Sequence, residues 1–325
     1  MTQSLGFLVL SGFPMACLTS AIEPLRAANE ITGKLAFHWQ VIGETAGRVE
    51  SSAAVAFEPD LPLERVADLD YLFLLSGPDG AFANPGRANG QLRRLARAGM
   101  RIGAVSGAIF PLARAGLLDG HRVAVHWLYH SAFQAAFPDI EASSSVIEID
   151  RNRLTVAGAS SAFDLALGLV EESLGPEVMT EVACWFQHPV IRGEGVAQKT
   201  PGYRADRTQD TMPAMIARAI KIFETHLEEP IQIAEVAERL RISARQLDRS
   251  FRRYTGRAPL AYYRMLRMKQ ARQLVLYTKD TLTTIALAVG YGSTTPLVKH
   301  YVAEFGITPQ EDRAAQAGLR IRKGG

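Results

Sequence analysis

The sequence predicts an α/β domain built on a parallel sheet, followed by an all-α domain, and three observations support this. Over about the first 185 residues, short apolar runs that end at Gly or Ser alternate with helical patterns, which is typical of a parallel α/β sandwich. The rest of the chain is mostly helical and repeats a set of residues at an offset of 50. The net charge is +3, but residues 211–325 hold 19 Lys and Arg against 10 Asp and Glu.

The elements of the first domain follow from this alternation. Apolar runs predict strands at 6–10, 37–43, 71–77 and 101–107, a further strand pair at 144–150 and 153–159, and helices at 18–31, 89–99 and about 162–174. Ligand sites in such a sandwich lie at the carboxyl ends of the strands. The first domain is therefore expected at residues 1–192.

Residues 193–213 are polar, contain Gly and Pro, and show no periodicity, so they are predicted to form a linker. The second domain, 214–325, contains short helices at 233–240 and 282–289 and a longer helix at 260–276 between them. The 50-residue repeat matches Ser243, Leu247, Arg249, Phe251, Gly256 and Pro259 with Ser293, Leu297, Lys299, Tyr301, Gly306 and Pro309. Two helix-turn-helix units joined by a connecting helix are the simplest interpretation.

The composition argues against a membrane or secreted protein. No apolar run reaches the ~18 residues that a membrane-spanning helix needs, and "MTQSLGFLVLSGF" lacks the basic start of a signal peptide. Cys17 and Cys184 form neither a metal motif nor a disulfide framework. We expect a cytoplasmic protein that has no metal or cofactor and no membrane partner.

The first helix-turn-helix unit has the features of a DNA-reading helix. Ser243 is a natural N-cap, and Gln246 completes a capping box. Leu247, Phe251 and Tyr254 form one apolar stripe. The opposite face carries Arg245, Arg249, Arg252 and Arg253, and arginine suits both guanine edges and phosphates. A merely solvated arginine face is the alternative.

Residues from about 215 to 313 resemble the AraC family DNA-binding domain over its whole length. The resemblance lies in "ARQLDRSFRRYTGRAPLAYYRMLRMKQARQLV" and "IALAVGYGSTTPLVKHYVAEFGITPQEDR". This resemblance implies that the chain binds double-stranded promoter DNA, contacts RNA polymerase, and acts as an activator. Members of the family place two recognition helices in successive major-groove faces.

The second unit departs from the usual family pattern because its helix holds few arginines. Its candidate DNA-binding residues are Thr294, Thr295, Lys299 and His300. Lys299 and His300 are expected to be the outward cations, and Glu304 is expected to repel phosphate. We therefore expect this helix to contribute less base readout than the first.

The stretch "GAVSGAIFPLARAGLLDG" predicts a turn from a buried strand into a helix, with Ser106 at the corner. Residues 5–190 resemble the class I glutamine amidotransferase-like (PfpI-like) domain, which has a flavodoxin-like fold. The resemblance lies in this stretch and in "FLVLSGFPM", "AIEPLRAAN", "YLFLLSGPDG" and "VAVHW". Enzymes of that superfamily carry a corner Cys with a His and a nearby Glu, which here correspond to Ser106, His126 and Glu23. Serine is a poorer unaided nucleophile than cysteine, so we expect a site that binds without catalysing.

A small zwitterion is the expected ligand. The hydroxyl of Ser106 and the N–H groups of Gly107 and Ala108 are predicted to form a carboxylate site, and Glu23 would attract an ammonium group. The other candidate ligand-binding residues are Phe13, Gly77, Pro78, Asp79, His126 and Trp127. A quaternary ammonium could also gain from aromatic faces, of which Trp127 is the best candidate. The family resemblance points to betaine, carnitine or amino-acid metabolites.

Three functions remain open at this point. The preferred one is a ligand-responsive transcription regulator, expected to be a homodimer. The second is a hydrolase or lyase of the PfpI type with an accessory DNA-binding module. The third is a constitutive DNA-binding protein whose first domain only dimerises.

Overall fold

The structure is a computed structural model that describes residues 2–188, 191–199 and 213–321. The chain divides into two compact units, Met1–Gln198 and Lys199–Gly325, and each is described by itself. Within the described ranges, no helix is long and apolar enough to cross a membrane.

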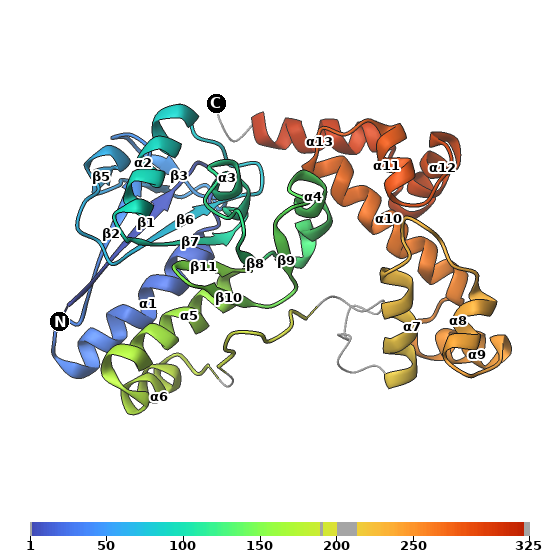
Figure 1. Ribbon diagram of the computed structural model, residues 1–325, viewed down its shortest axis with the longest axis horizontal. Helices are drawn as coiled ribbons and strands as arrows, with labels where there is room; N and C mark the ends of the chain where they lie inside the picture. The colour runs from blue at the N-terminus through green and yellow to red at the C-terminus, as the bar shows by residue number, and fades with distance from the viewer. Residues whose placement is uncertain (1, 189–190, 200–212, 322–325) are drawn as a thin grey trace. The chain divides into compact units, whose positions relative to one another are not determined.

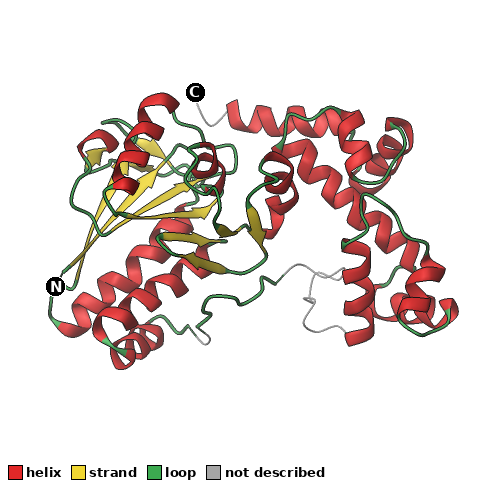
Figure 2. Ribbon diagram, in the orientation of Figure 1, coloured by secondary structure: helices red, strands yellow, loops and turns green. Residues whose placement is uncertain are grey.

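The first unit is built on a seven-stranded sheet with the order β10-β11-β7-β6-β1-β2-β5 (Figure 2). Its strands are β1 Gln3–Val9, β2 Phe37–Gly43, β5 Leu61–Pro62, β6 Tyr71–Ser76, β7 Arg101–Ser106, β10 Ile147–Asp150 and β11 Arg153–Val156. All neighbours pair in parallel except β10 with β11. The predicted parallel α/β sandwich is therefore confirmed, with one antiparallel edge strand. Only two residues join β10 to β11, and so short a connection can only reverse the chain.

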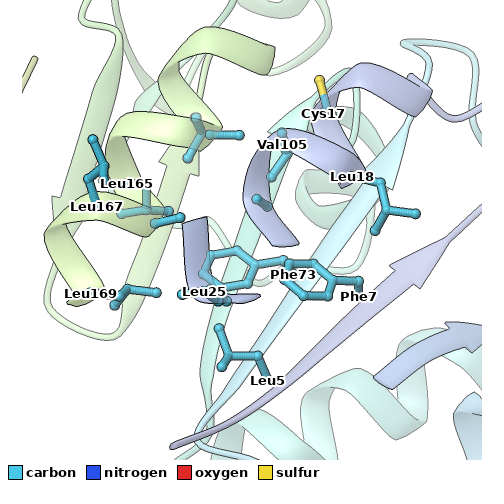
Figure 3. Close-up of a cluster of buried hydrophobic side chains, with 14 of the residues drawn as sticks. Leu5, Phe7, Cys17, Leu18, Leu25, Phe73, Val105, Leu165, Leu167 and Leu169 are labelled. Atoms are coloured by element: carbon cyan, nitrogen blue, oxygen red, sulfur yellow. The ribbon is translucent and has the colours of Figure 1, made fainter. Parts of the chain in front are cut away.

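Helices cover both faces of this sheet (Figure 1). Helices α1 Met15–Thr32, α5 Ala159–Leu174 and α6 Pro176–Trp185 lie together on one face, and α2 Pro85–Arg97 and α3 Ile109–Arg114 lie on the other. Figure 3 shows the core under α1 and α5, where Phe7 and Phe73 of the sheet meet Leu25 and Leu165 of the helices. Fully burying such side chains contributes about 1.5–3 kcal/mol each.

Short elements complete the first unit. They are the strand pair β3 Val49–Glu50 and β4 Ala56–Phe57, the strand pair β8 Arg122–Ala124 and β9 Glu141–Ser143, the 3-10 turns η1 Leu63–Arg65 and η2 Trp127–Tyr129, and α4 His130–Ala136. The "VAVH" run (123–126) predicts a strand and overlaps β8. The sequence did not predict the other pieces or α6, because each is too short or too mixed in composition to show a clear period.

The second unit is helical and contains two hydrophobic cores. Its helices are α7 Ala214–Glu224, α8 Ile233–Arg239, α9 Ala244–Thr255, α10 Pro259–Tyr277, α11 Leu282–Ala288, α12 Thr294–Phe305 and α13 Pro309–Ile321. Tyr263 and Met265 of α10 pack into the core around α7–α9, and Met268 and Leu274 pack into the core around α11 and α12. The connecting helix α10 therefore belongs to both helix-turn-helix units, as the repeat predicts.

Two ion pairs of this unit join distant segments. The Nη1 atom of Arg257, just beyond α9, lies 2.9 Å from a carboxylate oxygen of Glu304 on α12. Arg272 of α10 pairs with Asp312 of α13 at 2.7 Å, and the Tyr301 hydroxyl donates to the same carboxylate. Because Glu304 is engaged by Arg257, part of the charge expected to repel phosphate is neutralised within the unit.

The segment predicted as a linker begins on the first unit. Residues 193–198 are hydrogen-bonded there: the Val146 N–H donates to the Val196 carbonyl at 2.7 Å, and the Gln198 N–H donates to the Ser144 carbonyl at 2.8 Å. Residues 200–212 of the predicted linker lie outside the described residues.

Candidate functional site

The site begins at the corner where β7 ends. Ser76 and Ser106 lie side by side as the last paired residues of β6 and β7. Ser106 has φ +59°, a strained backbone for a residue other than glycine that occurs often at functional sites. A Cβ on Gly107 would lie 2.2 Å from backbone atoms of Gly77 and Pro78, so only glycine allows the two loops to meet. The predicted strand-to-helix corner is present.

The corner serine is bonded to a phenol. The Ser106 and Tyr129 hydroxyl oxygens are 2.6 Å apart in a buried contact. The Nδ1 atom of His126 accepts the Leu128 N–H at 3.2 Å, and burial lowers the pKa of the imidazole. His126 therefore caps the η2 turn as a neutral ring, and its ring contacts that of Tyr129 with centroids 5.1 Å apart. The Tyr129 phenol thus occupies the place beside Ser106 that a serine hydrolase gives to its base.

The structure does not bring all predicted ligand-binding residues together. Glu23 is half-buried on α1, and its carboxylate pairs with Arg26 at 3.0 Å. Phe13 is fully buried and packs edge-on against Phe57, so it belongs to the core. The Ala108 N–H donates to the Val105 carbonyl at 3.3 Å, which engages one of the two amides expected to hold a carboxylate.

The remaining candidates lie at the same edge of the sheet. Gly77 and Pro78 contact Gly107, and Asp79 stands near Arg114 on the solvent side of that loop. Trp127 is half-buried and its ring lies 5.5 Å from the His126 ring. Ser106, Gly107, His126 and Trp127 thus form one continuous group with the 76–80 loop.

The sequence does not predict two residues of this group, Tyr129 and Gln198. Tyr129 follows the recognisable "VAVHW" run by only two residues, so its spacing could have suggested it. Gln198 lies in the polar stretch that was predicted as a linker, and no sequence pattern marks it. Its amide oxygen accepts the Trp127 N–H at 2.9 Å.

A separate cavity of about 420 Å³ lies beyond the end of β2. It is lined by Glu44, Thr45, Ala46, Pro62, Leu63, Glu64, Arg65, Asn84, Arg87, Ala88 and Gln91. The Glu44 carboxylate accepts the N–H groups of Ala83 and Asn84 at 2.7 Å each, and Glu64 pairs with Arg87. The carboxylates that line this cavity are therefore already engaged by neighbouring groups of the protein.

In the second unit, α9 has the predicted recognition-helix geometry. Ser243 and Gln246 form a complete capping box, and Leu247 and Phe251 are fully buried. Arg245, Arg249, Arg252 and Arg253 are all exposed. Arg252 pairs with Asp248 at 2.8 Å. Among the described residues, Arg245 and Arg249 have no ion pair, so both guanidinium groups are available to an external anion.

Helix α12 offers less charge than α9. Ser293 occupies the N-cap position without a side-chain hydrogen bond, and Lys299 and Thr295 are exposed while Thr294 is half-buried. The His300 Nδ1 atom lies 2.9 Å from the Tyr291 hydroxyl. Burial and the nearby Arg264, Lys299 and Arg267 lower the pKa of His300. The expectation of His300 as an outward cation is therefore wrong at neutral pH.

Comparisons with known proteins agree with this two-part architecture. The DJ-1/PfpI family matches residues 10–172, and a helix-turn-helix domain matches residues 236–315. The HTH-type transcriptional regulator GbdR of Pseudomonas aeruginosa is 34% identical over 314 residues, which cover 97% of this chain and 85% of the relative. The HTH-type transcriptional regulator GlxA of Rhizobium meliloti is 30% identical over 308 residues, 94% of each protein.

Solved structures support the fold of the first unit. The crystal structure of an AraC family transcriptional regulator from Pseudomonas putida superposes with a TM-score of 0.52 at 25% identity, and it covers 57% of this chain and 99% of that one. Together these findings define a DNA-binding regulator with a DJ-1/PfpI sensor-type domain. The chain belongs to the AraC-type HTH transcriptional regulators of this architecture, and this family membership implies that it binds double-stranded DNA in a sequence-specific way.

Proposed function

We propose that the protein is a cytoplasmic, homodimeric activator that responds to a small zwitterion bound beside Ser106. The observation that carries this proposal is the 2.6 Å contact between the Ser106 and Tyr129 hydroxyls. A serine nucleophile needs a base aligned on its hydroxyl, and the hydrogen-bonding partner of the Ser106 hydroxyl is the phenol of Tyr129 and not an imidazole. The strained corner is then best explained as a binding group.

The chemistry of the group favours a ligand with a carboxylate and a cationic end. The Ser106 and Tyr129 hydroxyls can donate to a carboxylate, and Trp127 offers an aromatic face to a quaternary ammonium. Betaine, carnitine and amino-acid metabolites, which the family resemblance suggests, all have this form. Because Glu23 pairs with Arg26, the proposed cationic contact relies on the aromatic rings and not on that carboxylate.

Site variants of the full-length chain test this assignment. A thermal-shift screen with glycine betaine, carnitine and free amino acids first identifies the effector, which at about 100 Kd should add ~2.7 kcal/mol of stability. Ser106→Ala removes one hydrogen-bonding group worth about 0.5–1.5 kcal/mol, so it should raise the effector Kd about three- to tenfold. Trp127→Ala should raise it further, because apolar contact is lost as well.

A matched control separates this site from the 420 Å³ cavity near β2. Gln91→Ala alters that cavity and should leave the effector Kd unchanged. If Gln91→Ala weakens binding while Ser106→Ala and Trp127→Ala do not, the effector occupies the cavity and our site assignment fails. Mass spectrometry of the effector after incubation tests the enzymatic alternative. Turnover that disappears in Ser106→Ala would overturn the regulator-only interpretation.

A further inference from the structure

We propose that Gln198 is a positioning residue that couples the effector site to the segment leading into the DNA-binding unit. We call residues 125–129 the effector loop and residues 191–198 the strap. The proposal rests on the function proposed above, since it describes how effector binding at that site would affect the rest of the chain. Gln198 is the last residue of the first unit, and its side chain holds the effector loop.

Gln198 ties three segments together through one amide. Its Oε1 accepts the Trp127 N–H at 2.9 Å. Its Nε2 donates to the carbonyl oxygens of Val125 at 2.8 Å and Ser145 at 2.9 Å. All three partners are backbone groups, and two of them, at Val125 and Trp127, belong to the effector loop, so these bonds depend on the backbone path of that loop. Gln198 is half-buried, whereas its neighbours Val196 and Ala197 are exposed.

The backbone of the strap reinforces this attachment over its last residues. Ala197 forms a bridge with Ser145, the Gln198 N–H bonds the Ser144 carbonyl, and the Val196 carbonyl accepts the Val146 N–H. These bonds extend the sheet edge beyond β10. Because the strap is otherwise exposed, few apolar contacts hold it, and hydrogen bonds decide whether it stays docked.

The start of the strap is anchored in a different way. The Asp164 carboxylate, fully buried on α5, pairs with Arg192 at 2.7 Å and lies 2.7 Å from the His188 ring. Breaking a buried pair of this kind is costly. The strap is thus firmly anchored at Arg192, and its Gln198 end is the part that can detach from the first unit.

The effector loop connects this end to the corner serine. Tyr129 is the last residue of the loop and its hydroxyl contacts that of Ser106. The backbone N–H of Trp127 donates to the Gln198 side chain. A ligand that engages the Ser106 and Tyr129 hydroxyls or the Trp127 ring must fit or change the loop geometry on which two of the three Gln198 bonds depend. Binding and strap docking are therefore linked equilibria, and each biases the other.

Hydrogen exchange of the full-length protein tests the attachment without any effector. In Gln198→Ala, protection of the Trp127 amide should fall about tenfold or more, because its acceptor is gone. Gln198→Glu should have a similar effect, because a carboxylate would face the Val125 and Ser145 carbonyl oxygens. Gln134→Ala, an exposed glutamine on α4, is the matched control and should leave Trp127 protection at the wild-type level.

A promoter reporter then tests the coupling. In Gln198→Ala, the ratio of expression with and without effector should fall to about one, while gel-shift affinity for the promoter fragment stays within twofold of wild type. Effector binding measured by thermal shift should persist, with Kd raised less than tenfold. A merely structural defect would instead reduce DNA binding or abolish effector binding altogether, and that result would overturn the coupling.

The outcomes distinguish this proposal from the proposed function. If wild type neither binds nor responds to any zwitterion of the screen, the effector assignment fails, whatever Gln198 does. If wild type responds and Gln198→Ala responds with the same ratio, the coupling is overturned and the sensor assignment stands. Unchanged Trp127 exchange in both Gln198 variants would refute the attachment itself.

Discussion

His126 illustrates how its surroundings fix the role of one side chain. Its Nδ1 atom accepts the Leu128 N–H, so the ring must keep a lone pair there. Burial lowers its pKa, so the neutral form dominates at pH 7. The residue that corresponds to a catalytic partner in PfpI-like enzymes therefore acts here as the cap of a turn.

This pKa shift predicts a specific pH dependence of stability. Below the ordinary histidine pKa of about 6.5, the unfolded chain binds a proton that folded His126 resists. The native state should thus lose stability as pH falls through that region. The Tm of wild type should drop further between pH 7.5 and 5.5 than the Tm of His126→Asn, in which the asparagine oxygen still caps η2.

Comparing the Tm curves of wild type and His126→Asn isolates His126, because the contributions of other groups with shifted pKa values are the same in both proteins. His121 and His300 also have lowered pKa values, but they are present in both proteins. Parallel Tm curves for wild type and His126→Asn would show that His126 titrates normally. The neutral-ring description of the site would then be untenable.

At single positions, the sequence predicts types of contact better than partners. The Ser106 corner was predictable because a strained turn needs Gly107 behind it, and that spacing is local. Glu23 was predicted near Ser106 from family resemblance, but its carboxylate pairs with Arg26. Tyr129 and Gln198 were not predicted because their roles depend on distant partners. Tyr129 contacts Ser106, 23 residues away, and Gln198 contacts Trp127, 71 residues away.

At the scale of elements, the two recognition helices differ in how their charges are used. Helix α9 exposes Arg245 and Arg249 without an ion pair among the described residues. In α12, His300 contacts Tyr291 and Glu304 pairs with Arg257. Lys299 is then the main exposed cation of α12, and α9 should dominate base readout.

DNA-binding measurements on single variants test this asymmetry. Arg245→Ala and Arg249→Ala should each cost about 1–3 kcal/mol in affinity for the native promoter if the arginine reads a base. Lys299→Ala should cost less and mainly reduce the salt dependence of binding. Arg218→Ala, an exposed arginine on α7, is the control and should change affinity little. Equal or larger losses for Lys299→Ala would contradict the assigned order of the helices.

The elements themselves were largely predictable, since each predicted strand and helix occurs within a few residues of its expected place. Alternating apolar runs reveal a parallel sheet because its strands are buried on both faces. The linker prediction was less successful at its start. Residues 193–198 are polar and aperiodic, yet backbone hydrogen bonds hold them to Ser144 and Val146, and such bonds leave no trace in side-chain periodicity.

At the scale of the whole molecule, the division into two units has a thermodynamic consequence. The core under α1 and α5 uses residues of the first unit alone, and the two helical cores use residues of the second alone. In the second unit, α10 contributes to both cores, and Arg257–Glu304 and Arg272–Asp312 join separate helices. Its two helix-turn-helix units should therefore unfold together, while the first unit unfolds on its own.

Calorimetry of the full-length protein should accordingly show two transitions. Effector at about 100 Kd adds ~2.7 kcal/mol to the unit that binds it. Because each kcal/mol shifts the Tm of a unit of this size by about 2–4 °C, the Tm of the first unit should rise by about 5–11 °C. Promoter DNA should raise the other transition, and Arg249→Ala should weaken only that second shift. Effector should shift the first transition in Gln198→Ala as well, since the variant loses coupling and not the site. A single transition would contradict the independent unfolding of the two units. An effector shift confined to the DNA-binding unit would show that the sensor site has been assigned to the wrong half of the chain.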